Sequence, residues 1–322
     1  LYVDATKGWL SVGQSKASDI TEQAAFVTAT GGTITTSGNF KIHTFTGPGT
    51  FCVSGAGNPL GSSTVDYLVV AGGGGGGRRG GGGGGGGYRE SSGAASGCYS
   101  RSPLGACVSA LPVSVQGYPI AVGGGGAGGT AGGPEQHGTN GVNSTFSTIT
   151  SAGGGGGEGA FPSPGGKSGG SGGGGQGRNP TGNAGSGNTP PVSPPQGNNG
   201  GAGSFPAPEP TSQAGGGGGG ATAAGQAAPS DNNSGDGGAG ATSSITASPV
   251  TRAGGGGGGA HYQYFPCGNA GTGGSGGGGP GDSTAGTVNT GGGGGSSNEC
   301  ATPINCAGAG GSGVVIIRYK FQ

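Results

Sequence analysis

Runs of consecutive glycine dominate this sequence and restrict what the chain can fold into. The stretch YLVVAGGGGGGRRGGGGGGGGYRE, residues 67–90, is a β-favouring segment followed by runs of six and eight glycines, separated only by Arg78 and Arg79. Glycine has no side chain to bury and loses more backbone freedom on folding than any other residue. The glycine is therefore either a flexible linker or the structural material itself. Ten such runs occur, some interrupted by Ala or Ser, at 72–77, 80–87, 123–129, 153–157, 169–175, 215–220, 254–259, 273–279, 291–295 and 308–313.

Composition excludes a large apolar core of the ordinary kind. The 322 residues include 96 glycines and 21 prolines, and hydrophobic residues make up only 28% of the chain. Such a composition is typical of low-complexity, disordered or fibrous proteins. Disordered chains, however, usually carry high net charge, whereas 12 basic and 12 acidic residues leave this chain neutral. We therefore expect the glycine to be ordered.

Three structures could account for the glycine runs. Flexible linkers explain isolated runs, but not ten runs punctuated by apolar residues and cysteines. Collagen requires glycine at every third position, and these runs are consecutive. The third structure is a bundle of polyglycine-II helices, which are extended helices of the polyproline-II type with about three residues per turn and no internal hydrogen bonds.

Glycine lets such helices approach closely enough to bond to one another through backbone N–H and C=O groups, which must find partners. Each bond contributes about 0.5–1.5 kcal/mol net. The sequence therefore predicts a mostly irregular, all-β class of fold, in which a polyglycine-II bundle with variable loops is bracketed by a small antiparallel β-sheet.

Both ends of the chain predict β-strands. Residues 31–71 contain β-favouring runs, with turns expected at 37–39 and 47–49 and a further strand at 65–71. The strongest strand signal is GVVIIRYKF, residues 313–321. Its alternation predicts a half-buried strand with one apolar face and one polar face. The apolar face would carry Val315, Ile317, Tyr319 and Phe321, and the other face Arg318 and Lys320.

The chain is thereby divided into three regions. Residues 1–71 form a β-rich connector or attachment region, which includes the only tryptophan, Trp9. Residues 72–312 form the glycine-rich bundle with its variable loops. Residues 313–322 form a strand that returns to the N-terminal sheet. Because the sequence lacks methionine, we expect it to be a processed product or the downstream part of a longer protein.

The alternation of glycine-rich motifs and variable loops resembles the glycine-rich distal adhesins on the long tail fibres of T-even-like phages. The flanking motifs YVDATKGWL, FKIHTFTGPGTFCV, VDYLVVAGGGGGG and GVVIIRYKF are similar to glycine-rich domains in structural proteins of many phages, notably marine ones. The resemblance implies a layered sandwich of polyglycine-II helices with loops at its tip that bind host surface proteins. The β-rich N-terminal part departs from those adhesins, which carry an attachment domain there.

The resemblance favours a phage tail-fibre or virion-surface protein that displays loops for host attachment. Its location would be the virion surface or the extracellular space. Its partners would be a host cell-surface protein or glycan, other virion or fibre proteins, and further copies of itself, for example in a trimer. The alternative is a structural virion decoration or extracellular filament subunit without a ligand. An antifreeze protein would need a regular Ala/Thr/Ser face, which the irregular loops do not suggest.

Aromatic and arginine side chains on loops are the candidates for receptor contact, because such residues commonly anchor interfaces. The segments that carry them include AHYQYFPCG at 260–268 and the proline-rich AFPSPGG and SFPAPEP. The alternative is that these aromatic rings cap the glycine layers and shield the backbone from water. The candidates are Tyr88, Tyr99, Arg101, Phe161, Phe205, His261, Tyr262, Tyr264 and Phe265.

The six cysteines favour disulfides over zinc or redox sites. Two pairs lie close in sequence, in CYSRSPLGAC and CATPINC, and neither has CxxC spacing. We expect Cys98 to pair with Cys107 and Cys300 with Cys306, which would indicate an oxidising, extracellular setting. Free thiols are the alternative, and the pairing of Cys52 and Cys267 is left open.

No pattern indicates catalysis, a cofactor or a metal. The three histidines, at 43, 137 and 261, are scattered, and DNNSGDGG at 231–238 lacks the ligand spacing of a calcium loop. We expect no enzyme activity, no catalytic residues and no metal site. Twelve dispersed Lys and Arg residues form no footprint for nucleic acid. The sequence has no apolar run of 18 residues, so no membrane insertion is expected.

Overall fold

The computed structural model describes residues 2–4, 8–9, 23–97, 99–105, 107–130, 136–160, 165–177, 183–204, 212–230, 232–262, 268–298 and 306–322. Within these ranges the chain is nearly all β, with antiparallel sheets, extended segments, a single 3₁₀ turn (η2, Pro103–Gly105) and no α-helix. The strands are β1 (Tyr2–Asp4), β2 (Gly8–Trp9), β3 (Val27–Thr30), β4 (Thr33–Ser37), β5 (Phe40–Phe45), β6 (Gly49–Ala56), β7 (Thr64–Val70), β8 (Tyr88–Glu90), β9 (Leu111–Pro112), β10 (Gly117–Ala121), β11 (Ser144–Phe146), β12 (Ile149–Ser151), β13 (Ser212–Ala214), β14 (Ala241–Ser243), β15 (Val250–Arg252), β16 (Ala260–Tyr262) and β17 (Val314–Lys320).

Two antiparallel sheets hold most of these strands. A six-stranded sheet has the order β4-β5-β17-β7-β8, with β9 paired to β7 outside this order. A five-stranded sheet has the order β12-β11-β10-β6-β3, and the pairs β1–β2, β13–β16 and β14–β15 are separate. Because β17 lies between β5 and β7, strands from both ends of the chain meet in one sheet.

The turns of the first sheet follow the local sequence. β4 and β5 form a hairpin in which Ser37 pairs with Phe40, and Gly38 in its turn has a φ of 55°. Glycine adopts such a left-handed conformation without steric cost. The chain bends again at 46–48, but the strands on either side of this bend, β5 and β6, belong to different sheets. The second expected turn therefore connects two sheets.

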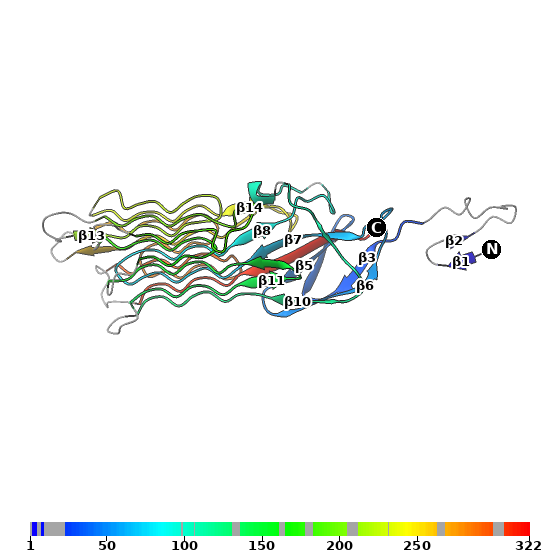
Figure 1. Cartoon of the computed structure of the whole chain (residues 1–322), viewed down its shortest axis with the longest axis horizontal. Coiled ribbons are helices and arrows are strands. Elements are labelled where there is room, and N and C mark those ends of the chain that lie inside the picture. Colours follow the sequence, from blue (N-terminus) through cyan, green and yellow to red (C-terminus); the bar gives the residue numbers. More distant parts are fainter. Residues whose placement is uncertain are drawn as a thin grey trace.

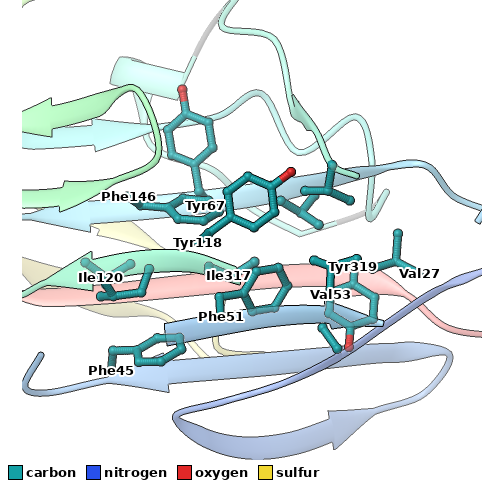
Figure 2. Packing of buried hydrophobic residues seen from close by; sticks show 14 of the residues in the cluster. Val27, Phe45, Phe51, Val53, Tyr67, Tyr118, Ile120, Phe146, Ile317 and Tyr319 are labelled. Atoms are coloured by element: carbon teal, nitrogen blue, oxygen red, sulfur yellow. The ribbon is translucent and has the colours of Figure 1, made fainter. Parts of the chain in front are cut away.

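An apolar core fills the space between the two large sheets (Figure 2). Phe51 of β6 is fully buried, and its ring meets the rings of His43 and Phe146 nearly edge-on, with centroids 5.0 and 6.0 Å apart. Such edge-to-face pairs add to the stabilisation that burial itself provides. The core is formed by Val27, Ala29, Phe45, Phe51, Val53, Val65, Tyr67, Val69, Val113, Tyr118, Ile120, Phe146, Val315, Ile317 and Tyr319.

Strand β17 is buried on both faces, which corrects the expectation of a half-buried strand. Its predicted apolar face does lie in the core, where Val315, Ile317 and Tyr319 are fully buried. The opposite face packs into a second apolar cluster, and even Arg318 is only 5% exposed. The physical reason is that residues from β8, β14 and β15 and their connections cover this face. The second cluster contains Ile42, Leu68, Val70, Tyr88, Ala221, Ala241, Ile245, Ala253, Val314 and Ile316.

The glycine segments are extended but are not sheet strands, and their backbone groups bond to several neighbours. In the run 72–77, successive N–H groups donate hydrogen bonds to three different segments in turn. Each segment accepts a second hydrogen bond from the residue three positions later in the run. A sheet strand, in contrast, bonds to its neighbours within one plane. The donor–acceptor pairs are Gly72–Val142 and Gly75–Thr139, Gly73–Gly311 and Gly76–Gly308, and Gly74–Gly84 and Gly77–Gly81, at N···O distances of 2.8–3.1 Å.

Close packing of neighbouring backbones explains why these positions are glycine. A Cβ atom added to Gly73 would lie 2.1 Å from the carbonyl oxygen of Gly292, and one added to Gly74 would lie 2.2 Å from that of Gly155. Neither glycine has a left-handed φ. Glycine is therefore required because neighbouring segments of the same chain lie too close for a side chain. The backbone conformation itself would tolerate one.

The molecule is elongated (Figure 1). The large sheets and the C-terminus lie toward one end, and the glycine segments run along the long axis to the other, where β13 and β16 lie. We call this the far end. The chain reverses there between Gly77 and Gly81, since the segments 71–77 and 81–87 are bonded antiparallel.

Candidate functional site

The far end brings together segments that lie far apart in the sequence. The backbone N–H of Arg78 donates to the carbonyl oxygen of Gln136 at 2.8 Å, and the N–H of Ala160 donates to that of Arg78 at 3.1 Å. The N–H of Gly259 donates to the carbonyl oxygen of Gly80 at 2.9 Å. The turn at 78–80 is thus bonded to three other segments, which makes the far end a composite surface.

Part of the predicted receptor-binding segment 260–268 lies at this end. In the β13–β16 pair, His261 lies opposite Gln213 and Tyr262 lies opposite Ser212. The backbone of both predicted contact residues is therefore at the far end. Four other candidates, Phe161, Phe205, Tyr264 and Phe265, lie outside the described residues.

The three remaining candidates lie beside the six-stranded sheet. Tyr88, in β8, is 1% exposed, and its hydroxyl donates to Glu90 at 3.2 Å. Its ring belongs to the second apolar cluster, so the structure gives no support to a receptor contact through Tyr88. Tyr99 is half-buried against the same cluster, whereas Arg101 is exposed.

An open cavity of about 400 Å³ adjoins this region and is lined by Tyr99, Ser100, Arg101, Ser102 and Pro103. An aromatic ring, a guanidinium and two serines suit a small polar ligand. The cavity lies near β8, because η2 packs against that strand. It is therefore separate from the far end.

The carboxylate of Glu90 anchors the lining of this cavity to the sheet. It accepts hydrogen bonds from the Ser102 N–H at 2.9 Å and the Ser243 Oγ at 2.5 Å, in addition to Tyr88. Burial raises the pKa of Glu90, and these hydrogen bonds offset part of that rise. Burial lowers the pKa of nearby Arg252, an effect opposed by the charge of Glu90. The Glu90 carboxylate thus ties the loop at Ser102 to strand β8.

Asp66, in the neighbouring strand β7, also binds residues that follow β8. Its carboxylate accepts hydrogen bonds from the Ser91 Oγ at 2.7 Å and from the N–H and Oγ of Ser96 at 2.7 and 2.6 Å. Sequence reasoning missed both Asp66 and Glu90. The available signal was a charged residue inside a β-favouring segment, as in TVDYLVV, because such a residue must find partners when the strand is buried.

A third buried carboxylate, Glu158, lies within the glycine region close to the far end. It is 1% exposed, and it accepts hydrogen bonds from the N–H groups of Gly165 and Gln176 at 2.9 and 2.8 Å. Burial raises the pKa of Glu158, and the two backbone hydrogen bonds oppose the rise. The signal in the sequence was a single charge at the end of a glycine run, GGGGGEGA. The side chain ties three segments together.

The predicted disulfides are not found among the residues that the structure describes. Cys52, Cys107 and Cys306 carry free, exposed thiols. The expected partners of the last two, Cys98 and Cys300, lie outside the described residues. The alternative of free thiols holds for these three cysteines.

The described ranges contain neither a candidate metal site nor a helix that could span a membrane. No group of three or more His, Cys, Asp or Glu side chains in these ranges is placed to hold a metal ion. No helix in the same ranges is long and apolar enough to span a bilayer. His43 is fully buried in the core, where its Nδ1 donates to the Gly31 carbonyl oxygen at 2.7 Å.

The model of a family described as a glycine-rich domain matches residues 45–320, which is most of the chain. This protein belongs to the glycine-rich domain family. The matched range runs from the last residue of β5 to the end of β17 and so includes all the glycine segments. No curated protein matches the chain.

Proposed function

We propose that the glycine segments are polyglycine-II helices packed into a rigid bundle. The backbone hydrogen bonds that repeat every three residues support this proposal, because a helix of the polyproline-II type has about three residues per turn and leaves its N–H and C=O groups for neighbours. The carbonyl oxygens close to the glycine Cα positions also support it. Such contacts leave no room for a side chain at these glycine positions.

The bundle would be the shaft of a phage tail-fibre or virion-surface protein that attaches to a host cell. The observation that carries this proposal is the arrangement of the far end. Because the closely packed glycine positions leave no room for a Cβ atom, most side chains that could recognise a partner lie at the surface and ends of the bundle. Segments from many parts of the chain meet at the far end, opposite the two large sheets. The sheets would attach the protein to the virion, and the far end would contact a host surface protein or glycan.

A cell-binding assay tests this proposal. The fluorescently labelled chain would be mixed with a panel of marine bacteria and compared with a variant in which residues 260–268 are replaced by Gly and Ser. A control variant would change the exposed Leu60 and Val115, which lie beside the large sheets, to Ser. We expect binding to a subset of strains that the 260–268 variant loses and the control keeps. Equal binding by all three proteins would refute attachment through the far end.

A structural role in assembly is the second candidate, and one observation favours it. Strand β4 is the edge of the six-stranded sheet, and Thr33–Thr36 are exposed. An exposed edge strand without Lys or Pro can pair with another chain. Light scattering of the wild type and of a Thr35→Pro variant would distinguish the roles. Oligomers that the variant loses, together with absent cell binding, would favour a virion decoration or filament subunit.

A further inference from the structure

The cavity beside β8 is walled by consecutive residues whose backbone is bonded to two other elements. These lining residues are Tyr99, Ser100, Arg101, Ser102 and Pro103. The N–H of Ser102 donates to the carboxylate of Glu90, in β8, at 2.9 Å. The carbonyl oxygen of Ser100 accepts a hydrogen bond at 2.8 Å from the N–H of Ser244, which directly follows β14. A wall fixed from two sides keeps its shape, so little conformational entropy is lost when a ligand enters.

Two buried carboxylates support this loop, although a carboxylate is costly to bury. Asp66 and Glu90 are 0% and 2% exposed. The donors to Asp66 are Ser91 and Ser96, so both carboxylates bind the segment 91–102. An apolar residue in either strand would pack into the sheet without this desolvation cost. The placement of both carboxylates against one loop indicates that the loop is held in a defined shape, as the supporting residues of a binding site are.

Arg101 supplies a cation to the lining of the cavity. Its side chain is exposed, and its guanidinium donates one hydrogen bond, to the Ser92 carbonyl oxygen at 3.3 Å. Within the described ranges no carboxylate forms an ion pair with it. The two buried arginines nearby differ, because Arg252 and Arg318 each interact with the charge of a buried carboxylate. Arg101 therefore leaves one positive charge uncompensated, which suits a ligand with a single negative charge.

The other lining residues suit a sugar ring. Ser100 is exposed and adds a hydroxyl that can donate or accept a hydrogen bond. Tyr99 is half-buried, and the guanidinium of Arg318, 5.3 Å from its ring centroid, holds the ring in place. Pro103 adds an exposed apolar surface. The volume of about 400 Å³ lies at the lower end of the range for small-molecule sites. A hydroxyl-rich ring with one acidic group matches this combination.

We propose that this cavity binds a uronic acid unit of a polysaccharide, a sugar ring that carries one carboxylate. The Arg101 guanidinium engages the carboxylate through paired N–H donors, and Ser100 and Tyr99 contact the hydroxyl groups and the C–H groups of the ring. A phosphate monoester carries more negative charge than one cation compensates, and the two carboxylates behind the loop would repel it. This inference goes beyond the proposed function, because the cavity is separate from the far end.

Isothermal titration calorimetry of the full chain tests the inference. The probes are trigalacturonate, the matched neutral galactotriose and galactose 1-phosphate. We expect trigalacturonate to bind with an affinity that falls as salt is added, and the other two probes to bind at least about tenfold more weakly. Arg101→Gln should weaken trigalacturonate binding by at least about tenfold, since it removes charge-assisted hydrogen bonds. Arg101→Lys keeps the charge but not the paired donors, so it should recover part of the binding.

Matched variants separate the cavity from general effects of charge and stability. Lys167→Gln removes an exposed positive charge in the glycine region, outside the cavity lining. This variant and the 260–268 variant of the far end should bind trigalacturonate as the wild type does. Arg101→Gln should unfold at the same temperature as the wild type, because Arg101 is exposed. The inference would be overturned by absent trigalacturonate binding, by equal or tighter binding of either other probe, by unchanged affinity in Arg101→Gln, or by loss of binding in either control.

Discussion

Replacing one interior glycine by alanine should destabilise this protein strongly, and the structure allows the effect to be estimated. In Gly74→Ala, the new Cβ would lie 2.2 Å from the carbonyl oxygen of Gly155. Because Cβ atoms essentially never approach closer than 3.0 Å, the two segments must separate by at least about 0.8 Å. That shift would stretch the hydrogen bond from Gly84 N–H to Gly155 and the bond from Gly74 N–H to Gly84, both 2.8 Å, beyond normal length.

Two weakened hydrogen bonds cost about 1 kcal/mol each, and overpacking adds about 1–3 kcal/mol. The reduced entropy of the unfolded chain returns about 0.4–1 kcal/mol. The expected loss is therefore about 2–4 kcal/mol in the free energy of unfolding. Equilibrium urea denaturation followed by circular dichroism would measure it.

The control is the same substitution in an outer segment. A Cβ on Gly124 meets no atom within 4 Å, and this residue is exposed. Gly124→Ala should therefore stabilise the protein by about 0.4–1 kcal/mol, because only the unfolded-state entropy changes. Opposite signs for the two variants are the expected result. A Gly74→Ala protein as stable as the wild type would refute the argument that glycine is required for close backbone packing.

Three further predictions follow from buried groups. Burial raises the pKa of Glu158 above its ordinary 4.5, so the protonated carboxyl favours the folded state; this contribution to the free energy of unfolding is present below pH 4.5 and is lost as the pH rises through the folded-state pKa. Urea denaturation should therefore show the wild type gaining stability relative to Glu158→Gln from pH 7 to pH 5. The same pH dependence of stability in both proteins would contradict this. Ile317→Ala in the core should lower the free energy of unfolding by about 2–5 kcal/mol, measured by the same urea denaturation. The exposed control Val288→Ala should lower it by less than about 0.5 kcal/mol. The amide of Gly83, bonded to Gly294 at 2.9 Å, should exchange slowly by hydrogen-exchange mass spectrometry, whereas exchange as fast as in a peptide would mean that the segments are mobile.

Local patterns were sufficient to predict several elements of the fold. A β-favouring run identified the strand β7, and alternation identified β17 and its apolar face containing Val315 and Ile317. The turn at Gly38 was also predicted. These features depend on neighbours in the sequence, through side-chain alternation and the conformational freedom of glycine.

Other features depended on contacts that no local pattern contains. Tyr88 follows a glycine run and precedes a charged pair, and only the covering segments from β14 and β15 make it a core residue. The same segments bury the second face of β17. The far end likewise combines Arg78 with Gln136 and Ala160, residues that nothing in the sequence links.

The sequence by itself determined that the glycine region must be held by its backbone, because it contains too few apolar side chains to be held otherwise. It also predicted that strands from both ends of the chain would meet in one antiparallel sheet, as β5, β7 and β17 do. Only the tertiary structure decided which glycine segment lies beside which. One run of glycine presents the same donors and acceptors as any other, so no side chain encodes the pairing. The sheets and the chain reversals set the neighbours, as where Gly73 bonds to Gly311, which lies more than half the chain length away in the sequence.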